Sequence, residues 1–116
     1  MSDIQIYHNP RCSKSRQTLA LLTERGIEPD VIEYLKTAPT VSELQSVISK
    51  LGISARELLR SKEAEYKEQG LDNLDLTEAD IIKAMAEFPK LIERPIVIKG
   101  DQARIGRPPE NVLEIL

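Results

Sequence analysis

The sequence has very few of the residues that build disulfide frameworks and zinc sites. It holds one cysteine and one histidine in 116 residues. A single cysteine excludes an internal disulfide and indicates a reducing compartment, so we expect a cytoplasmic protein. One cysteine and one histidine supply too few zinc ligands unless carboxylates join them, so we expect no metal site.

Long apolar runs, aromatic residues and an excess of positive charge are also missing. No apolar run approaches the ~20 residues of a membrane-spanning helix, and Met1-Ser2-Asp3 do not resemble the start of a secretory signal. The net charge is −3, the pI is near 5.2, and three tyrosines and one phenylalanine are the only aromatic residues. These features argue against nucleic acid and membrane as partners. We expect one domain over residues 1–116 that acts as a monomer.

The only cysteine, Cys12, lies where a strand should pass into a helix. The stretch Ile4–Tyr7 is apolar and favours a strand, Asn9-Pro10 is a turn signal, and a helical pattern follows over about residues 14–25. The first N–H groups of a helix have no internal partners and carry the positive end of its dipole. They therefore stabilise a thiolate and can bind an oxyanion.

The charges around Cys12 favour the same interpretation. No Asp or Glu lies between residues 4 and 23, whereas Arg11, Lys14 and Arg16 are basic. Such surroundings favour the thiolate, which is the nucleophilic form of cysteine. We therefore expect an anion-cradling loop made by Ser13, Lys14 and Ser15. His8 is a candidate for orienting Cys12 or accepting its proton.

A plainer alternative exists for each of these residues. A lone cysteine is often a small buried apolar residue without chemistry, and His8 could be a polar residue at a strand end. Because Cys12 lies after a turn and between polar and basic residues, we prefer the reactive interpretation.

The rest of the chain alternates strands and helices. Asp30–Leu35 is rich in β-branched residues and predicts a second strand, parallel to the first, because a helix connects the two. Capping-box patterns at Thr40, Ser54 and Thr77 predict the starts of helices. Residues 96–99 and 102–105 flank Gly100-Asp101 and predict a hairpin, and a short helix follows Pro108. The expected fold is α/β, a mixed four-stranded sheet flanked by helices, with a helical insertion between the second and third strands.

Three arginines lie where regular runs begin or end: Arg60, Arg94 and Arg107. A guanidinium binds tetrahedral oxyanions through paired hydrogen bonds that lysine cannot reproduce. Each one alone is most simply a solvated surface residue, and sequence spacing does not bring them together. Pro95, which follows Arg94 directly before a strand, is a candidate for a cis peptide bond.

Four blocks of the sequence together resemble the ArsC family, the glutaredoxin-coupled arsenate reductases of thioredoxin-like fold. The blocks are Tyr7–Arg16, Gly52–Arg60, Glu93–Val97 and Arg104–Pro108, in family order. The resemblance covers essentially the whole chain and is closest to the short branch of the family.

This resemblance implies a thiol-dependent oxidoreductase that reduces arsenate to arsenite. Cys12 would be the nucleophile and His8 would help to keep it ionised. Arg60, Arg94 and Arg107 would form the oxyanion site, with a cis bond at Arg94-Pro95. Glutathione would be a co-substrate and glutaredoxin a partner, with no bound cofactor. External thiols are required because Ser15 stands where a dithiol enzyme would have its second cysteine.

Two rival functions differ in what they require near Cys12. A cysteine phosphatase of the C-x5-R type needs an arginine six residues after the cysteine, where this chain has Thr18. A non-enzymatic partner-binding or regulatory protein of the same fold is the stronger rival. The presence of all three arginines favours the reductase over that alternative.

Overall fold

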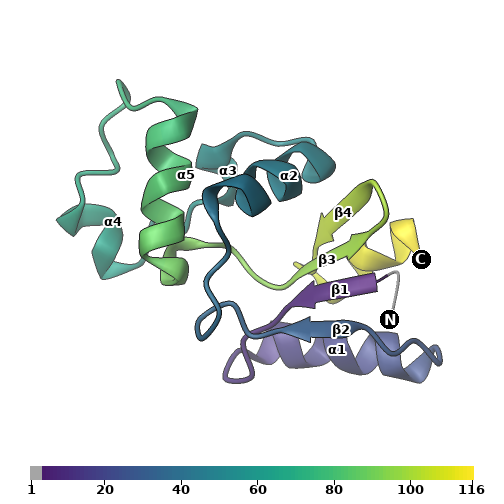
Figure 1. Ribbon diagram of the computed structural model, residues 1–116. Coiled ribbons are helices and arrows are strands. Elements are labelled where there is room, and N and C mark those ends of the chain that lie inside the picture. The colour runs from purple at the N-terminus through teal and green to yellow at the C-terminus, as the bar shows by residue number, and fades with distance from the viewer. Residues whose placement is uncertain (1–3) are drawn as a thin grey trace. The chain divides into compact units, whose positions relative to one another are not determined.

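The computed structural model describes residues 4–116, which group into two compact units. The first unit comprises residues 4–37 together with Arg94–Leu116, and the second comprises Ala38–Glu93. Figure 1 shows the four strands in the first unit, and the second unit as a group of helices that enters the sequence between the second and third strands. The expectation of one domain over residues 1–116 stays a prediction.

The first unit contains a mixed sheet of four strands. They are β1 (Ile4–Tyr7), β2 (Asp30–Ile32), β3 (Ile96–Lys99) and β4 (Gln102–Ile105), in the order β2-β1-β3-β4. β1 is parallel to β2 and antiparallel to β3, which pairs in turn with β4 as an antiparallel hairpin. The predicted fold class is therefore confirmed, including the parallel pair and the hairpin.

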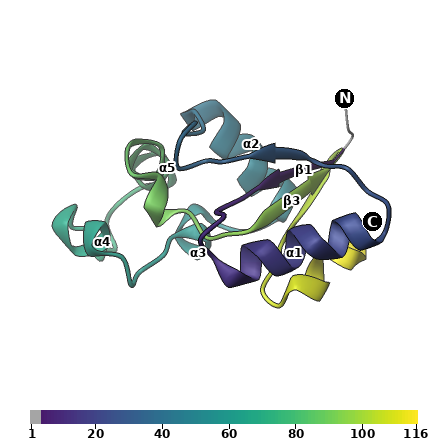
Figure 2. The ribbon, with the colours of Figure 1, turned by 90° about the horizontal axis from the view of Figure 1, so that it is seen from below.

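Two helices lie on the same side of this sheet, as Figure 2 shows. They are α1 (Ser13–Glu24) and the 3-10 helix η2 (Pro109–Ile115), which contact each other. Ile6 and Val97 of the sheet pack with Leu22 of α1 and with Val112 and Ile115 of η2 in one buried cluster. Since Ile6 and Val97 are opposite each other in the sheet, this apolar core fixes α1 against the central strands.

The second unit consists of helices. They are α2 (Val41–Leu51), α3 (Ala55–Leu58), α4 (Ala64–Glu68), α5 (Glu78–Glu87) and the 3-10 helix η1 (Pro89–Leu91). Three of them, α2, α3 and α5, begin directly after the capping residues predicted from the sequence. Both sides of the predicted capping box are present at Thr40 and at Thr77. At Ser54 the side chain accepts a hydrogen bond from the N–H of Glu57, while the N–H of Ala55 donates to Glu78. The capping box predicted at Ser54 is therefore only half formed.

Three expected boundaries differ from those observed. β2 ends at Ile32 instead of Leu35, because the Glu33 carbonyl accepts the N–H groups of Lys36 and Thr37 and turns the chain. The first helix begins and ends one residue earlier than expected. The last helix is of the 3-10 type, and its Asn111 N–H donates to the Pro108 carbonyl three residues earlier.

Gly106 allows the segment after β4 to approach α1 closely. A Cβ atom at this position would lie 2.5 Å from Thr18 Oγ1 and 2.8 Å from Pro95 Cγ. Thr18 is fully buried and its hydroxyl donates to the Lys14 carbonyl at 2.8 Å, so it has little room to move. Only a residue without a side chain fits here, and this contact holds the chain after β4 beside the first turns of α1.

We predict that Gly106→Ala destabilises the protein, because the added methyl group must displace Thr18 or Pro95. Overpacking of this kind costs about 1–3 kcal/mol. Urea denaturation measures the change. Gln17→Ala is the control, because Gln17 is an exposed neighbour of Thr18 on the same helix and should change the free energy of unfolding by less than about 0.5 kcal/mol. Equal stability of the Gly106→Ala variant and the wild type would contradict the role of this contact.

Candidate functional site

Cys12 is the N-cap residue of α1. Its backbone is extended, with φ −93° and ψ 124°, and its carbonyl accepts the N–H of Arg16 at 3.0 Å. Its own N–H donates to the Asn9 carbonyl at 3.0 Å, which closes the turn after β1. The position predicted from sequence is therefore the observed one, and the thiol is largely buried.

The first helical N–H groups belong to Ser13, Lys14 and Ser15, the residues predicted to cradle an anion. The first turn of α1 contains no acidic residue, so its positive end is not neutralised locally. The three side chains differ in exposure: Ser13 is exposed, Lys14 is partly exposed, and Ser15 is fully buried. Any anion contact of Ser15 therefore involves its N–H group, since its hydroxyl faces the interior.

Arg107 brings a cation to the thiol from the other end of the chain. Its Nη2 atom donates to Cys12 Sγ at 3.6 Å, and its Nε atom donates to the Arg94 carbonyl at 2.8 Å. The Asn111 side chain donates to the Arg107 carbonyl at 3.0 Å. The peptide bonds at Arg94-Pro95 and Arg107-Pro108 are both cis, of which the sequence indicated only the first. The Arg107 guanidinium thus contacts both the Cys12 sulfur and the backbone carbonyl of Arg94.

His8 contacts Ser15 instead of Cys12. Its Nδ1 atom lies 2.6 Å from Ser15 Oγ, and its N–H donates to the Ile32 carbonyl at 2.9 Å. Burial lowers the pKa of His8 below its ordinary value of 6.5, Glu33 opposes this effect, and Arg16 adds to it. Within residues 4–116 no hydrogen bond joins His8 to Cys12. The lowered pKa favours an uncharged His8 at neutral pH, and its ring contact is with Ser15.

Asn9 organises the turn and was not singled out as a site residue from the sequence. Its Oδ1 atom accepts the N–H of Arg11 at 3.0 Å, and its own N–H donates to Ser15 Oγ at 3.0 Å. Asparagine before proline did indicate a turn, and such side chains often accept hydrogen bonds from the backbone two residues later. The bond to Ser15 has no comparable signal in the sequence.

Arg60, the third predicted arginine, belongs to the second unit. Its Nη1 atom lies 2.6 Å from a Glu63 oxygen, and its Nε atom lies 3.8 Å from a Glu93 oxygen. The N–H of Arg60 donates to the Leu91 carbonyl, and the N–H of Glu93 donates to the Leu58 carbonyl. These bonds fix Arg60 and Glu93 on two paired segments. Sequence reasoning missed Glu63 as the partner of Arg60, although its spacing of three residues was a possible signal.

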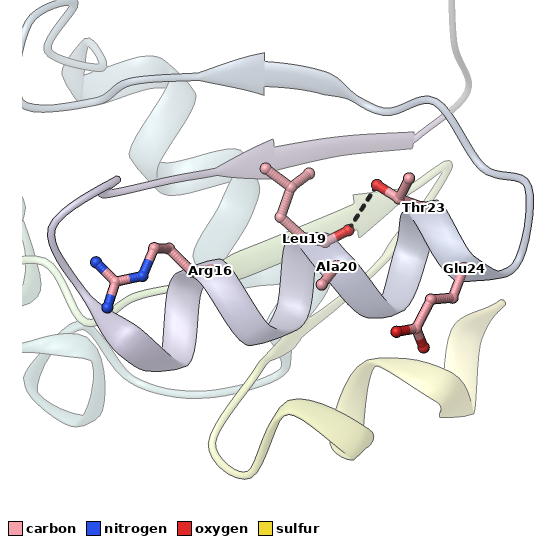
Figure 3. Close-up of a pocket in the computed structure, with 5 residues that line it drawn as sticks. All are labelled: Arg16, Leu19, Ala20, Thr23 and Glu24. Atoms are coloured by element: carbon pink, nitrogen blue, oxygen red, sulfur yellow. Dashed lines mark hydrogen bonds between the residues drawn. The ribbon is translucent and has the colours of Figure 1, made fainter.

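A separate hollow lies on the surface of α1. Figure 3 shows the residues that line it, which are Arg16, Leu19, Ala20, Thr23 and Glu24. The hydroxyl of Thr23 donates to the Leu19 carbonyl at 3.0 Å and therefore remains within the helix. None of the residues predicted to act in catalysis or anion binding lines this hollow.

Over residues 4–116, no group of three or more histidine, cysteine, aspartate or glutamate side chains is arranged to hold a metal ion. Over the same residues, no helix combines the length and the apolar character needed to cross a membrane.

The chain belongs to the ArsC family, whose sequence pattern matches residues 7–115. It is 59% identical to a protein of Haemophilus influenzae named arsenate reductase, over 96% of this chain and 97% of that protein. It is 55% identical to the uncharacterized protein YfgD of Escherichia coli K12, over 97% of this chain and 96% of that protein. Among solved structures it resembles an arsenate reductase from Vibrio cholerae with a TM-score of 0.95 and 56% identity, over 97% of both chains.

We predict that Arg107→Gln slows alkylation of Cys12 by iodoacetamide at pH 7. Two unit charges about 4 Å apart attract by about 1 kcal/mol in water, and by more in a partly buried site. Loss of about 1 kcal/mol of thiolate stabilisation lowers the alkylation rate about fivefold. Pseudo-first-order kinetics followed by mass spectrometry give this rate. The control is Arg25→Gln, which removes the same charge from an exposed position at the end of α1. If both variants react as fast as the wild type, Arg107 does not activate the thiol.

Proposed function

We propose that this chain is a thiol-dependent arsenate reductase in which Cys12 is the nucleophile. The observation that carries the proposal is the single cysteine at the N-cap of α1 with the Arg107 guanidinium 3.6 Å from its sulfur. A cation and the N–H groups of a helix start favour the thiolate and also attract an oxyanion to the same place. Membership of the ArsC family and relatives named arsenate reductase support arsenate as that oxyanion.

The proposed substrate site combines cations with backbone donors. The guanidinium groups of Arg94 and Arg107 and the N–H groups of Ser13, Lys14 and Ser15 are the proposed donors to the arsenate oxygens. Arg60 is the third proposed ligand. It belongs to the second unit, where its Nη1 atom lies 2.6 Å from a Glu63 oxygen.

The first chemical step forms a bond between sulfur and arsenic. The Cys12 thiolate attacks the arsenic atom, and one arsenate oxygen takes up protons and leaves as water. Arsenic remains pentavalent in this thiol–arsenate adduct. The arginines and helix N–H groups stabilise the negative charge on the oxygens that stay bound.

The second step transfers two electrons to arsenic. A glutathione thiolate attacks the Cys12 sulfur, a sulfur–sulfur bond forms, and the sulfur–arsenic bond breaks with its electron pair on arsenic. Trivalent arsenite is released and a mixed disulfide of glutathione with Cys12 remains. Because the chain has no second cysteine, glutaredoxin must remove the glutathione by thiol–disulfide exchange. We infer that the protein works as a monomer in the cytoplasm, where reduced glutathione is available, and that it needs no bound cofactor.

We predict that incubation with arsenate and glutathione, without glutaredoxin, adds one glutathione to each chain. Intact-mass analysis detects this adduct, and separation of arsenic species detects the arsenite formed with it. Cys12→Ser should give neither product, and addition of glutaredoxin should remove the adduct. Phosphate is the matched control because it has the shape and charge of arsenate but is not reduced under these conditions.

If arsenate stays pentavalent and the protein keeps its unmodified mass, the chain is not an arsenate reductase. The non-enzymatic, partner-binding function of the same fold would then take its place.

A further inference from the structure

The hydroxyl group of Ser15 is completely buried between two partners. Its oxygen accepts the N–H of Asn9 at 3.0 Å and lies 2.6 Å from Nδ1 of His8. The Ser15 side chain is 0% exposed and His8 is 6% exposed, so water does not compete freely for either group. Both contacts lie in the first unit, in the turn that leads to Cys12.

The available hydrogens determine whether Ser15 Oγ or His8 Nδ1 donates in the contact between them. The Ser15 oxygen already accepts a hydrogen from Asn9, and its own hydrogen needs an acceptor. If His8 carried its proton on Nδ1, this nitrogen would donate to Ser15 and the hydroxyl hydrogen would be buried without an acceptor among residues 4–116. An unsatisfied buried donor costs about 1–3 kcal/mol. If Nδ1 is unprotonated, Ser15 donates to it, and the Ser15 hydroxyl, His8 Nδ1 and the Asn9 N–H are all paired.

We infer that Ser15 is a positioning residue that holds His8 as a neutral imidazole with its proton on Nε2. The hydroxyl of Ser15 occupies the lone pair of Nδ1, and the N–H of Asn9 orients that hydroxyl. Ser15 is therefore tied to the site through its side chain as well as through its place in the first turn of α1.

The charges near His8 agree with this assignment. Burial favours the neutral ring, Glu33 favours the charged ring and Arg16 disfavours it, and the net result is a lowered pKa. A protonated His8 would also bring the Nδ1–H against the Ser15 hydroxyl, which would then have to turn its own hydrogen away. Both effects keep the ring neutral at pH 7.

A neutral ring with its proton on Nε2 restricts what His8 can do. It cannot take the proton of Cys12 at Nδ1, because Ser15 occupies that atom, and it cannot take it at Nε2, which already carries one. It also provides no positive charge to the thiolate. The remaining role is that of a hydrogen-bond donor at Nε2 that stabilises developing negative charge without losing its proton. This catalytic role rests on the proposed function, whereas the tautomer does not.

The tautomer can be measured directly because the sequence has one histidine. A long-range proton–nitrogen correlation spectrum of the uniformly nitrogen-15-labelled, untagged protein at pH 7 distinguishes protonated from unprotonated ring nitrogens. We expect an unprotonated Nδ1 and a protonated Nε2. A wild-type spectrum with the proton on Nδ1, or with equal populations of both forms, overturns the inference.

Variants test whether Ser15 is the cause. Ser15→Ala removes the donor and should shift the ring toward a mixture of tautomers, with the titration midpoint of His8 moving up. Ser15→Thr keeps a hydroxyl and should retain the Nε2–H form. Thr23→Ala removes a hydroxyl from an exposed position of the same helix and should leave the histidine signals unchanged. Unchanged signals in a folded Ser15→Ala variant overturn the inference, and the wild-type spectrum decides the tautomer if that variant does not fold.

An activity measurement separates this inference from the proposed function. If the wild type reduces arsenate, Ser15→Ala should lower kcat at least about tenfold with KM changed less than about twofold, because the lost interaction acts mainly in the transition state. An unchanged kcat together with the expected spectral change removes the catalytic role of Ser15. Absence of turnover in the wild type removes the proposed function and leaves the spectroscopic result standing.

Discussion

The thiol of Cys12 has a guanidinium beside it because the chain after β4 lies against the start of α1. That approach depends on Gly106, where any side chain would collide with Thr18 and Pro95. One residue later, Arg107 reaches the sulfur from a position 95 residues away in the sequence. The hydrogen bond from Arg107 Nε to the Arg94 carbonyl then ties both ends of the β3–β4 hairpin to the site. Without this contact the cysteine would have only the helix start and the local basic residues to stabilise its thiolate.

Arg107 and His8, the two side chains near the turn after β1, differ in charge. Arg107 is a permanent cation that meets the sulfur directly, whereas His8 is buried and neutral and meets Ser15. In the proposed account, charge is supplied by arginine, and the histidine supplies a hydrogen bond in a fixed direction. Burial and the charge of Arg16 both disfavour an imidazolium at His8, while Glu33 favours it, and the net effect is a lowered pKa.

Local sequence signals predicted much of the fold correctly. The turn after β1, the N-cap position of Cys12, the capping boxes at Thr40 and Thr77 and the Gly100-Asp101 hairpin each depend on neighbouring residues, which a sequence shows directly. The end of β2 was misplaced because the turn formed by the Glu33 carbonyl competes with the β-branched pattern that favours a strand.

The site itself was only partly predictable. The proximity of Arg94 and Arg107 to each other, and of Arg107 to Cys12, follows from tertiary packing, and only the family resemblance suggested it. The hydrogen bond between His8 and Ser15 depends on the side-chain conformations of two buried residues, which no spacing rule gives. The contact of Arg60 with Glu93 likewise depends on segments that are brought together by backbone bonds across more than thirty residues, whereas its contact with Glu63 is local.

The measurement that tests the account most directly is arsenate-dependent oxidation of NADPH, coupled through glutathione reductase and glutaredoxin. The wild type should oxidise NADPH at a rate that rises and saturates with arsenate, while phosphate in place of arsenate should give no oxidation. Cys12→Ser should be inactive with either oxyanion. No arsenate-dependent oxidation in the presence of active coupling enzymes, or equal rates for the wild type and Cys12→Ser, would contradict the conclusion that this cysteine carries out arsenate reduction.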